Sequence, residues 1–222
     1  MTMKTIRLFI VRHGETEWNR QGIFRGLSDV PLSETGTSQA KKLGLVLATM
    51  PVSAIYSSRL VRAWKTAEAI AWNRKRRVTV RADRGLLDIH FGRLAGLTHK
   101  QAEAEFPAVH KRWFINPEAV SFPGGESLKN VGARARKTIN RIAGGADGGN
   151  VIVVTHQVVI RAILCRLLGI SLSHFRRFEI QPASISEARF EYGKWVLYRL
   201  NDVCHLETTT GRNHVKNKRS QS

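Results

Sequence analysis

The chain has 222 residues, of which 42% are hydrophobic and 24% charged, a composition that excludes a disordered or fibrous protein. Its formal net charge of +19 predicts an anionic ligand or partner, such as nucleic acid, a membrane surface or a phosphorylated small molecule. The length suits a single domain, which we expect over residues 1–205, followed by a basic, disordered tail over 206–222.

Near the N-terminus, the apolar run 8–11 lies between two arginines and is too short for a signal peptide or a membrane span. We therefore expect a cytoplasmic protein that does not contact a membrane. Cys165 and Cys204 have no spacing typical of a disulfide framework or a metal site, which predicts two reduced thiols.

In chain order, the apolar run 6–11 is typical of a strand that is buried on both faces. A helix beginning near Ser33 follows, and its apolar residues recur at helical spacing, which predicts one buried face. These residues are Ala40, Leu43, Val46, Leu47 and Met50. Next come a strand over 54–57, a helix over 59–72 and a strand over 78–82.

The second half begins with a helix over 127–142, a second strand buried on both faces over 151–154 and an apolar helix over 157–168. It ends with a predicted hairpin of strands 184–190 and 195–200. This alternation predicts an α/β fold, a three-layer, doubly wound, mostly parallel sheet with helices on both faces.

Two histidines follow the two most apolar strands, His13 after the first and His156 after strand 151–154. The carboxyl ends of parallel strands share one edge of a sheet, where ligands bind. Gly14 lets the backbone approach a ligand, and the helix that Gln157 opens presents free N–H groups that favour an anion. With the guanidinium of Arg62 in reach of this edge, the pattern predicts a phosphate site.

Six ordered motifs strengthen this interpretation. They are Val11-Arg12-His13-Gly14-Glu15-Thr16-Glu17-Trp18-Asn19; Arg25-Gly26 with Asp29-Val30-Pro31-Leu32-Ser33 and Gly36; Ser57-Ser58-Arg59-Leu60-Val61-Arg62-Ala63 with Thr66-Ala67; Phe91-Gly92 with Gly96-Leu97-Thr98; Pro123-Gly124-Gly125-Glu126-Ser127; and Val154-Thr155-His156. Over most of residues 5–200 the chain resembles the histidine phosphatase superfamily, also called the phosphoglycerate mutase-like superfamily, and the resemblance implies that fold.

The resemblance implies that His13 is the nucleophile, that Arg12, Arg62 and His156 hold the phosphoryl oxygens, and that Asn19 adds a further contact. An attacking imidazole must be neutral, and we expect the nearby arginines to lower the pKa of His13 from about 6.5. Because cationic donors stabilise the charge of the transferring phosphoryl group, no metal ion or other cofactor is required.

The superfamily places a proton-donating glutamate before the Phe-Gly pair, and here Asp88 occupies that position, so the resemblance implies that Asp88 is the acid. An aspartate is shorter than a glutamate by one carbon–carbon bond, roughly 1.5 Å. The alternative is a structural Asp88 that caps a turn. Candidate contacts for the rest of the substrate are Arg25, Gly26, His90, His99 and Gln157.

These observations predict a phosphomonoester hydrolase that acts on a small phosphorylated metabolite through a phosphohistidine intermediate. One alternative is a 2,3-bisphosphoglycerate-dependent phosphoglycerate mutase, indicated by the stretch 92–97, although region 99–122 is too short for the basic insertion of mutases. A noncatalytic anion- or nucleic-acid-binding module is the third hypothesis. We do not expect nucleic acid, since aromatic and basic residues do not alternate. The sequence is compatible with a homodimer.

Overall fold

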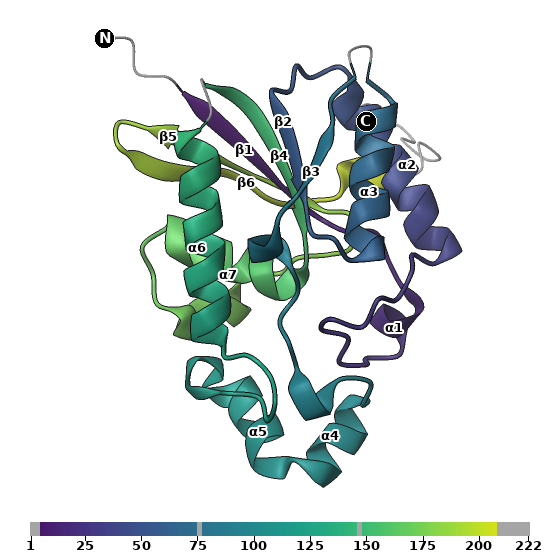
Figure 1. Ribbon diagram of the computed structural model, residues 1–222, viewed down its shortest axis with the longest axis vertical. Coiled ribbons are helices and arrows are strands. Elements are labelled where there is room, and N and C mark those ends of the chain that lie inside the picture. The colour runs from purple at the N-terminus through teal and green to yellow at the C-terminus, as the bar shows by residue number, and fades with distance from the viewer. Residues whose placement is uncertain (1–4, 75–76, 146–147, 208–222) are drawn as a thin grey trace, which may run out of the picture.

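The computed structural model describes residues 5–74, 77–145 and 148–207, and its centre is a six-stranded sheet of order β3-β2-β4-β1-β5-β6 (Figure 1). The strands are β1 (Ile6–Arg12), β2 (Ala54–Ser57), β3 (Val80–Ala82), β4 (Gly149–Thr155), β5 (Ile185–Glu191) and β6 (Lys194–Asp202). β3, β2, β4 and β1 are mutually parallel, whereas β5 and β6 form an antiparallel edge. The predicted doubly wound, mostly parallel sheet is confirmed.

Helices cover both faces of this sheet. Along β1, Leu8 and Ile10 enter one apolar cluster, while Phe9 and Val11 enter the other, as the two-residue period of a strand requires. The first cluster lies under α6 (Leu128–Gly144) and α7 (Gln157–Leu167), and the second lies under α2 (Glu34–Ala48) and α3 (Val61–Trp72). The result is the expected three-layer arrangement.

The predicted buried face of α2 is correct at Ala40, Leu43 and Leu47, whereas Met50 lies beyond the end of the helix at Ala48 and is only partly buried. Ser33 caps the helix by accepting a hydrogen bond from the backbone N–H of Gly36, and Leu43 and Leu47 are buried. Val46, however, is 47% exposed. Each helical residue turns by roughly 100°, which carries Val46 off the stripe that its neighbours at 43 and 47 define.

Two element starts also differ from the predictions. α3 begins at Val61 rather than at residue 59, because the carboxylate of Asp29, in a separate loop, accepts the backbone hydrogen bond of Val61 at 2.6 Å. β3 is shorter than residues 78–82, being confined to Val80–Ala82 at the sheet edge. The β5–β6 hairpin is confirmed; its turn residues Tyr192 and Gly193 both have positive φ, as a two-residue turn requires.

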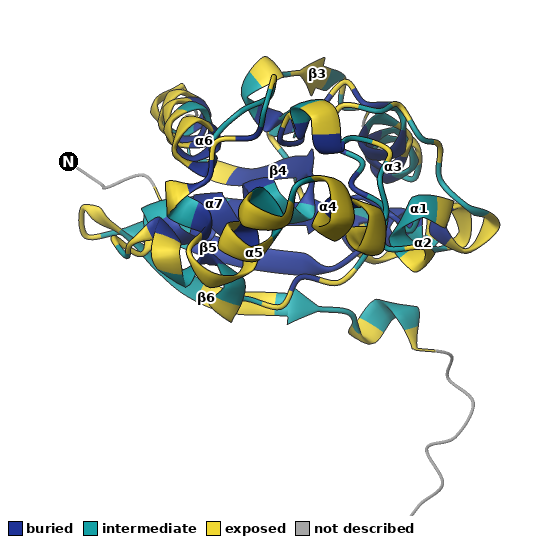
Figure 2. Ribbon diagram, turned by 90° about the horizontal axis from the view of Figure 1, so that it is seen from below, coloured by how far each residue is buried: buried dark blue, intermediate teal, exposed yellow. Residues whose placement is uncertain are grey.

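Beyond the carboxyl ends of the strands, α1 (Glu17–Arg20), α4 (His99–Glu105) and α5 (Pro107–Ile115) form a cap (Figure 1). Viewed from below, α4 and α5 are largely exposed, while β4 behind them is almost entirely buried (Figure 2). Trp113 anchors the cap through edge contacts with Phe91 and Phe122, whose ring centroids lie 6.1 and 5.1 Å away. The cap therefore encloses space over the strand ends.

At the other end of the described chain, Leu206 packs against the cluster under α2, and its carbonyl accepts a hydrogen bond from Lys42 Nζ at 2.8 Å. The remainder of the expected tail, residues 208–222, lies outside the described residues. Within the described ranges, no helix combines the length and apolar character needed to cross a membrane.

Candidate active site

His13 and His156 lie side by side because they follow neighbouring parallel strands. Arg12 pairs with Thr155 in the β1–β4 register, and the backbone N–H of His13 donates to the Thr155 carbonyl at 3.1 Å. The two imidazole centroids are 5.1 Å apart. The structure thus brings together the two histidines that the sequence predicts at one sheet edge.

Close backbone packing fixes the loop that carries His13. A Cβ atom on Gly14 would lie 2.4 Å from the carbonyl oxygen of Gly36, and one on Gly36 would lie 1.9 Å from that of Glu15. Gly14 also donates its backbone N–H to Thr66 Oγ1 on α3 at 3.1 Å. Both glycines are needed because no side chain fits between the loop and the start of α2.

The surroundings of His13 define its tautomer and its charge. Nδ1 lies 2.6 Å from the carbonyl oxygen of Gly14, which can only accept, so Nδ1 carries the proton and the lone pair is on Nε2. Burial holds the pKa of His13 well below its usual value, and Arg62, Arg25 and Arg12 lower it further. The arginines lower the pKa of His13 as predicted, but burial lowers it more than they do. His13 is therefore a neutral imidazole whose free lone pair is on Nε2.

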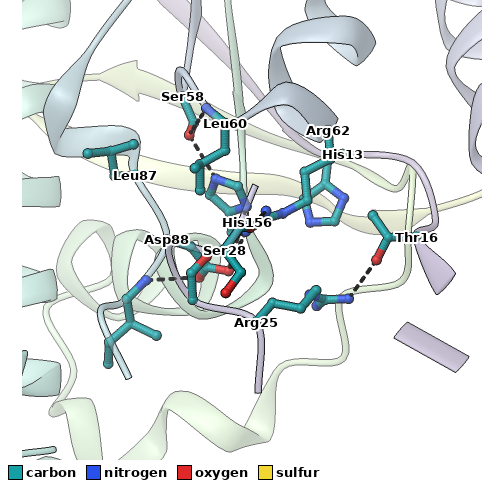
Figure 3. Close-up of polar contacts among 12 residues, drawn as sticks. His13, Thr16, Arg25, Ser28, Ser58, Leu60, Arg62, Leu87, Asp88 and His156 are labelled. Atoms are coloured by element: carbon teal, nitrogen blue, oxygen red, sulfur yellow. Dashed lines mark hydrogen bonds and ion pairs between the residues drawn. The ribbon is translucent and has the colours of Figure 1, made fainter. Parts of the chain in front are cut away.

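Arg62 is fully buried, and three acceptors orient its guanidinium (Figure 3). The carbonyl oxygens of Gly26 and Ser28 each accept a hydrogen bond at 2.8 Å, and Asp88 Oδ2 lies 3.2 Å from Nη2. Gly26 has a φ of 52°, and a Cβ atom there would lie 2.6 Å from the Ile89 carbonyl oxygen. Gly26 therefore serves the placement of Arg62.

Two further arginines reach the same region. Arg12 donates from Nη1 to the Ile180 carbonyl at 2.5 Å, and burial lowers the pKa of Arg12 to about 9. Arg25 donates from Nη1 to Thr16 Oγ1 at 3.1 Å, and burial lowers its pKa to about 10. Asn19 accepts from the Thr16 backbone through Oδ1 at 3.0 Å, which leaves its amide N–H groups to face the cavity described below.

His156 caps the start of α7 without a side-chain capping bond. Its Nε2 lies 2.9 Å from Ser58 Oγ, and its Nδ1 lies 3.7 Å from Asp88 Oδ2. Burial lowers the pKa of His156 well below its usual value, and Arg62 adds to this effect. His156 is thus a neutral side chain at a helix N-terminus, where backbone N–H groups favour an anion.

Asp88 is held at both its side chain and its backbone. Its Oδ1 accepts from the Ile89 N–H at 3.0 Å, and its carbonyl accepts from Arg134 Nη2 at 3.1 Å. Arg134 also donates to the Leu87 carbonyl at 2.7 Å and forms an ion pair with Glu126. Sequence reasoning missed Arg134; the available signal was Glu126 in the Pro-Gly-Gly-Glu-Ser motif.

A cavity of about 450 Å³ adjoins these groups and is bordered by Arg12, Asn19, Arg25 and Asp88. The predicted substrate contacts divide around it. Arg25, His99 and Gln157 line the cavity, Gly26 contributes its carbonyl to Arg62, and His90 is exposed and is not part of the lining. The structure therefore brings three of the five predicted contacts to the cavity.

Unsatisfied polar atoms converge on this region. Within the described ranges, buried nitrogens without a hydrogen-bond partner include Nε of Arg12, Arg25 and Arg62, Nε2 of His13 and Nδ1 of His156. Buried polar groups are normally hydrogen-bonded, so a cluster of unpaired ones indicates a ligand site. The same ranges contain no group of three or more side chains that could hold a metal ion. Three guanidiniums around a neutral imidazole form a cationic site whose donors suit the oxygens of a phosphoryl group.

Comparison with known proteins identifies the family. The model of the histidine phosphatase superfamily (branch 1) matches residues 8–203, and the chain belongs to this superfamily. Phosphoserine phosphatase 1 of Hydrogenobacter thermophilus is 37% identical over 201 residues, 90% of this chain and 94% of that protein.

Two solved structures are similar to this chain. Bacillus stearothermophilus YhfR matches with a TM-score of 0.86 and 29% identity, covering 91% of this chain and 100% of its own. Mycobacterial glucosyl-3-phosphoglycerate phosphatase Rv2419c has a TM-score of 0.81 and 30% identity, with coverages of 90% and 100%.

Proposed function

We propose that this protein is a metal-independent phosphomonoester hydrolase that acts on a small phosphorylated metabolite through a phosphohistidine intermediate. The observation that carries the proposal is the buried Nε2 of His13, a lone pair without a partner among the described residues, surrounded by three guanidiniums. The relative from Hydrogenobacter thermophilus is a phosphoserine phosphatase, and the mycobacterial structure is that of glucosyl-3-phosphoglycerate phosphatase. The names of both enzymes give a small phosphorylated metabolite as the substrate.

In the first step, His13 Nε2 attacks phosphorus and the bond from phosphorus to the ester oxygen breaks. Arg12, Arg62 and His156 hold the phosphoryl oxygens, where charge spreads during transfer, and Asn19 adds a contact. Asp88 gives its proton to the departing alkoxide, which leaves as the alcohol. A bound phosphoryl group competes with Asp88 for Nη2 of Arg62.

In the second step, water attacks phosphorus of phospho-His13 while the Asp88 carboxylate takes a proton from that water. The phosphorus–nitrogen bond breaks, inorganic phosphate leaves, and His13 returns to the neutral state. The hydrogen bond from Nδ1 to the Gly14 carbonyl is kept throughout, so attack and release use the same nitrogen.

The cap favours the phosphatase over the mutase alternative. The region between His99 and Phe122 consists of the two short helices α4 and α5 and a single 3-10 turn, Pro117–Ala119. This is too little chain for the basic insertion with which a mutase retains its bisphosphate. The third hypothesis, a noncatalytic anion- or nucleic-acid-binding module, would not require the neutral, unpaired Nε2 of His13.

The experiment measures phosphate release from 4-nitrophenyl phosphate and from a panel of metabolites that includes phosphoserine. It also measures isomerisation of 3-phosphoglycerate with trace 2,3-bisphosphoglycerate. We expect phosphate release, an acid-labile phosphohistidine trapped on the wild type, and no turnover by His13→Ala. Isomerisation without net release would favour the mutase. Undiminished turnover by His13→Ala would refute the proposed nucleophile.

We also propose that the protein is cytoplasmic, which is supported by its free cysteine thiols, Cys165 and Cys204. Assembly into a homodimer stays a prediction that light scattering in solution would test. Binding of nucleic acid is not expected.

A further inference from the structure

The cavity that Arg12 and Asp88 line also reaches two arginines that the proposed chemistry does not use. Arg161 lies on α7, one helical turn after Gln157, and Arg176 lies on the 3-10 helix η4 (Leu172–Arg177). Both side chains line the cavity that Arg12 and Asp88 border at the phosphoryl end.

Arg161 is a charged residue among the apolar residues 158–165 of α7. Its side chain is 10% exposed, and its Nε donates to the Phe178 carbonyl at 2.8 Å. Among the described residues, the carboxylate within ion-pair distance of Arg161 is that of Glu179. Its Oε2 lies 3.6 Å from Nη2 of Arg161, and its side chain is 69% exposed. Water screens such a contact, so the charge of Arg161 is only weakly compensated.

Arg176 is held without any carboxylate within 4.0 Å in the described part of the chain. Its Nε and Nη2 donate to the Trp113 carbonyl at 3.2 and 3.1 Å, and its guanidinium carbon lies 4.4 Å from the ring centroid of Phe114. Burial, with a contribution from Arg161, lowers the pKa of Arg176 to about 10. The two cations repel each other, and an anion between them would remove that repulsion.

The backbone of residues 178–180 connects Arg161 with the phosphoryl site. The Ile180 carbonyl accepts from Arg12 at 2.5 Å and from Gln157 Nε2 at 3.2 Å, and the Phe178 carbonyl accepts from Arg161. One helical turn, about 5.4 Å along the axis, separates Gln157 from Arg161. Arg12 and Arg161 are also close enough for the charge of Arg161 to lower the pKa of Arg12.

The size of the cavity points in the same direction. Its 450 Å³ falls within the range of roughly 300–1,000 Å³ that is typical of pockets for organic ligands. Aromatic side chains, among them Phe24, Trp113 and Phe175, line the same cavity as the arginines. The cavity therefore suits a short organic phosphate whose far end carries charge.

We propose that Arg161 and Arg176 form a second anion subsite, which selects phosphomonoesters that carry another anionic group, a carboxylate or a second phosphate, a few bonds from the transferred phosphoryl group. This inference rests on the proposed phosphatase function. It assigns substrate selection to two residues outside the phosphoryl-transfer machinery.

The test compares kcat/KM of the wild-type enzyme for matched substrates. Glycerol 3-phosphate has a neutral far end, 3-phosphoglycerate replaces that end with a carboxylate, and glycerol 1,3-bisphosphate replaces it with a phosphate. 4-Nitrophenyl phosphate reports the chemistry without a second anion. A charge-assisted hydrogen bond predicts a preference of roughly 10- to 100-fold for at least one anionic substrate over glycerol 3-phosphate. The preferred one identifies the anion.

The variants Arg161→Gln and Arg176→Gln should each reduce that preference by about 10-fold. The matched control is Arg177→Gln, since Arg177 is the exposed neighbour on η4 and is not part of the cavity lining. Arg177→Gln also removes one positive charge, and the preference for anionic substrates over glycerol 3-phosphate should be unchanged in this variant. Thermal melting establishes that each variant is folded, and the wild-type comparison does not depend on any variant.

Equal kcat/KM for neutral and anionic substrates, with 4-nitrophenyl phosphate hydrolysed, would overturn the subsite and leave the proposed function standing. A preference that survives in both folded variants would also overturn it. No phosphate release from any of the four substrates would overturn the proposed function, and the subsite with it.

Discussion

Both carboxylate oxygens of Asp88 accept hydrogen bonds, and replacing Asp88 with asparagine removes one of these two acceptors. Oδ1 accepts from the Ile89 N–H at 3.0 Å and Oδ2 faces Arg62 Nη2 at 3.2 Å, whereas an asparagine side chain has one acceptor oxygen. One donor must lose its partner in a site where Asp88 is 5% exposed, which costs about 1–3 kcal/mol of unfolding free energy. For a domain of this size, that corresponds to a fall in Tm of roughly 2–12 °C.

The effect on catalysis depends on the leaving group. If Asp88 is the general acid, Asp88→Asn should lower kcat/KM by roughly 10²–10⁴-fold for an alkyl phosphate such as glycerol 3-phosphate. The loss should be much smaller for 4-nitrophenyl phosphate, because 4-nitrophenolate leaves without protonation. The assay uses kcat/KM, which contains the phosphoryl transfer to His13 and excludes the later hydrolysis of phosphohistidine.

Asp29→Asn is the matched control. Burial lowers the pKa of Arg62, and the charge of Asp29, which accepts from the Val61 N–H at 2.6 Å, partly offsets this effect. The substitution therefore removes a carboxylate charge near the same arginine. We expect this variant to change kcat/KM by the same factor for the alkyl and the aryl phosphate. If Asp88→Asn also slows both esters equally, Asp88 is a structural residue and the assignment of the acid is refuted.

Three further predictions concern the support of the site. Arg134→Met should lower kcat/KM more for alkyl than for aryl phosphates, since it releases the backbone carbonyl of Asp88, and should cost about 1–3 kcal/mol of stability. Stability should fall as the pH drops from about 7 to 5, because the unfolded chain protonates His13 and His156 near pH 6.5 while their pKa values in the folded protein are lower. Gly36→Ala should destabilise by about 1–3 kcal/mol, since its Cβ would lie 1.9 Å from a backbone carbonyl oxygen.

Each of these has its own control. Arg136→Met removes an exposed arginine from the same helix and should leave the ratio of alkyl to aryl rates unchanged. In His13→Ala the slope of Tm against pH should be smaller, and a wild-type Tm that is constant from pH 7 to 5 would contradict the assignment. Gly144→Ala, at a site with nothing within 4 Å, should stabilise α6 slightly, by about 0.5–1 kcal/mol. Equal effects of the two glycine substitutions would refute the packing argument.

The order of elements and the catalytic edge could be predicted because both depend on local sequence. Apolar runs at 6–11 and 151–154 identify central strands, and a histidine directly after each must reach the same edge once the strands are parallel neighbours. The start of α3 could not be predicted in this way, because a carboxylate from a separate loop, that of Asp29, determines it.

The support of the site depends on contacts between distant segments, which local patterns do not reveal. Arg134 reaches Asp88 across 46 positions of sequence, and its nearby ion-pair partner Glu126 indicates Arg134 but not the contact with Asp88. Arg161 did leave a signal, since it interrupts an apolar helix, but only the structure shows that its side chain faces the cavity. Likewise, burial is the largest cause of the lowered pKa of His13, and the extent of this burial is known only from the folded structure.

The hydrogen bond from His13 Nδ1 to the Gly14 carbonyl fixes the tautomer of His13 through a main-chain acceptor. The acceptor belongs to the backbone of Gly14, so a changed side chain elsewhere does not remove it while Gly14 and Gly36 keep the close packing of the loop. A change of tautomer would require altering the peptide link itself, for example by replacing the residue 14–15 amide with an ester, whose carbonyl is a weaker acceptor. The proposed reactivity at Nε2 therefore depends on main-chain geometry, which the two glycines maintain.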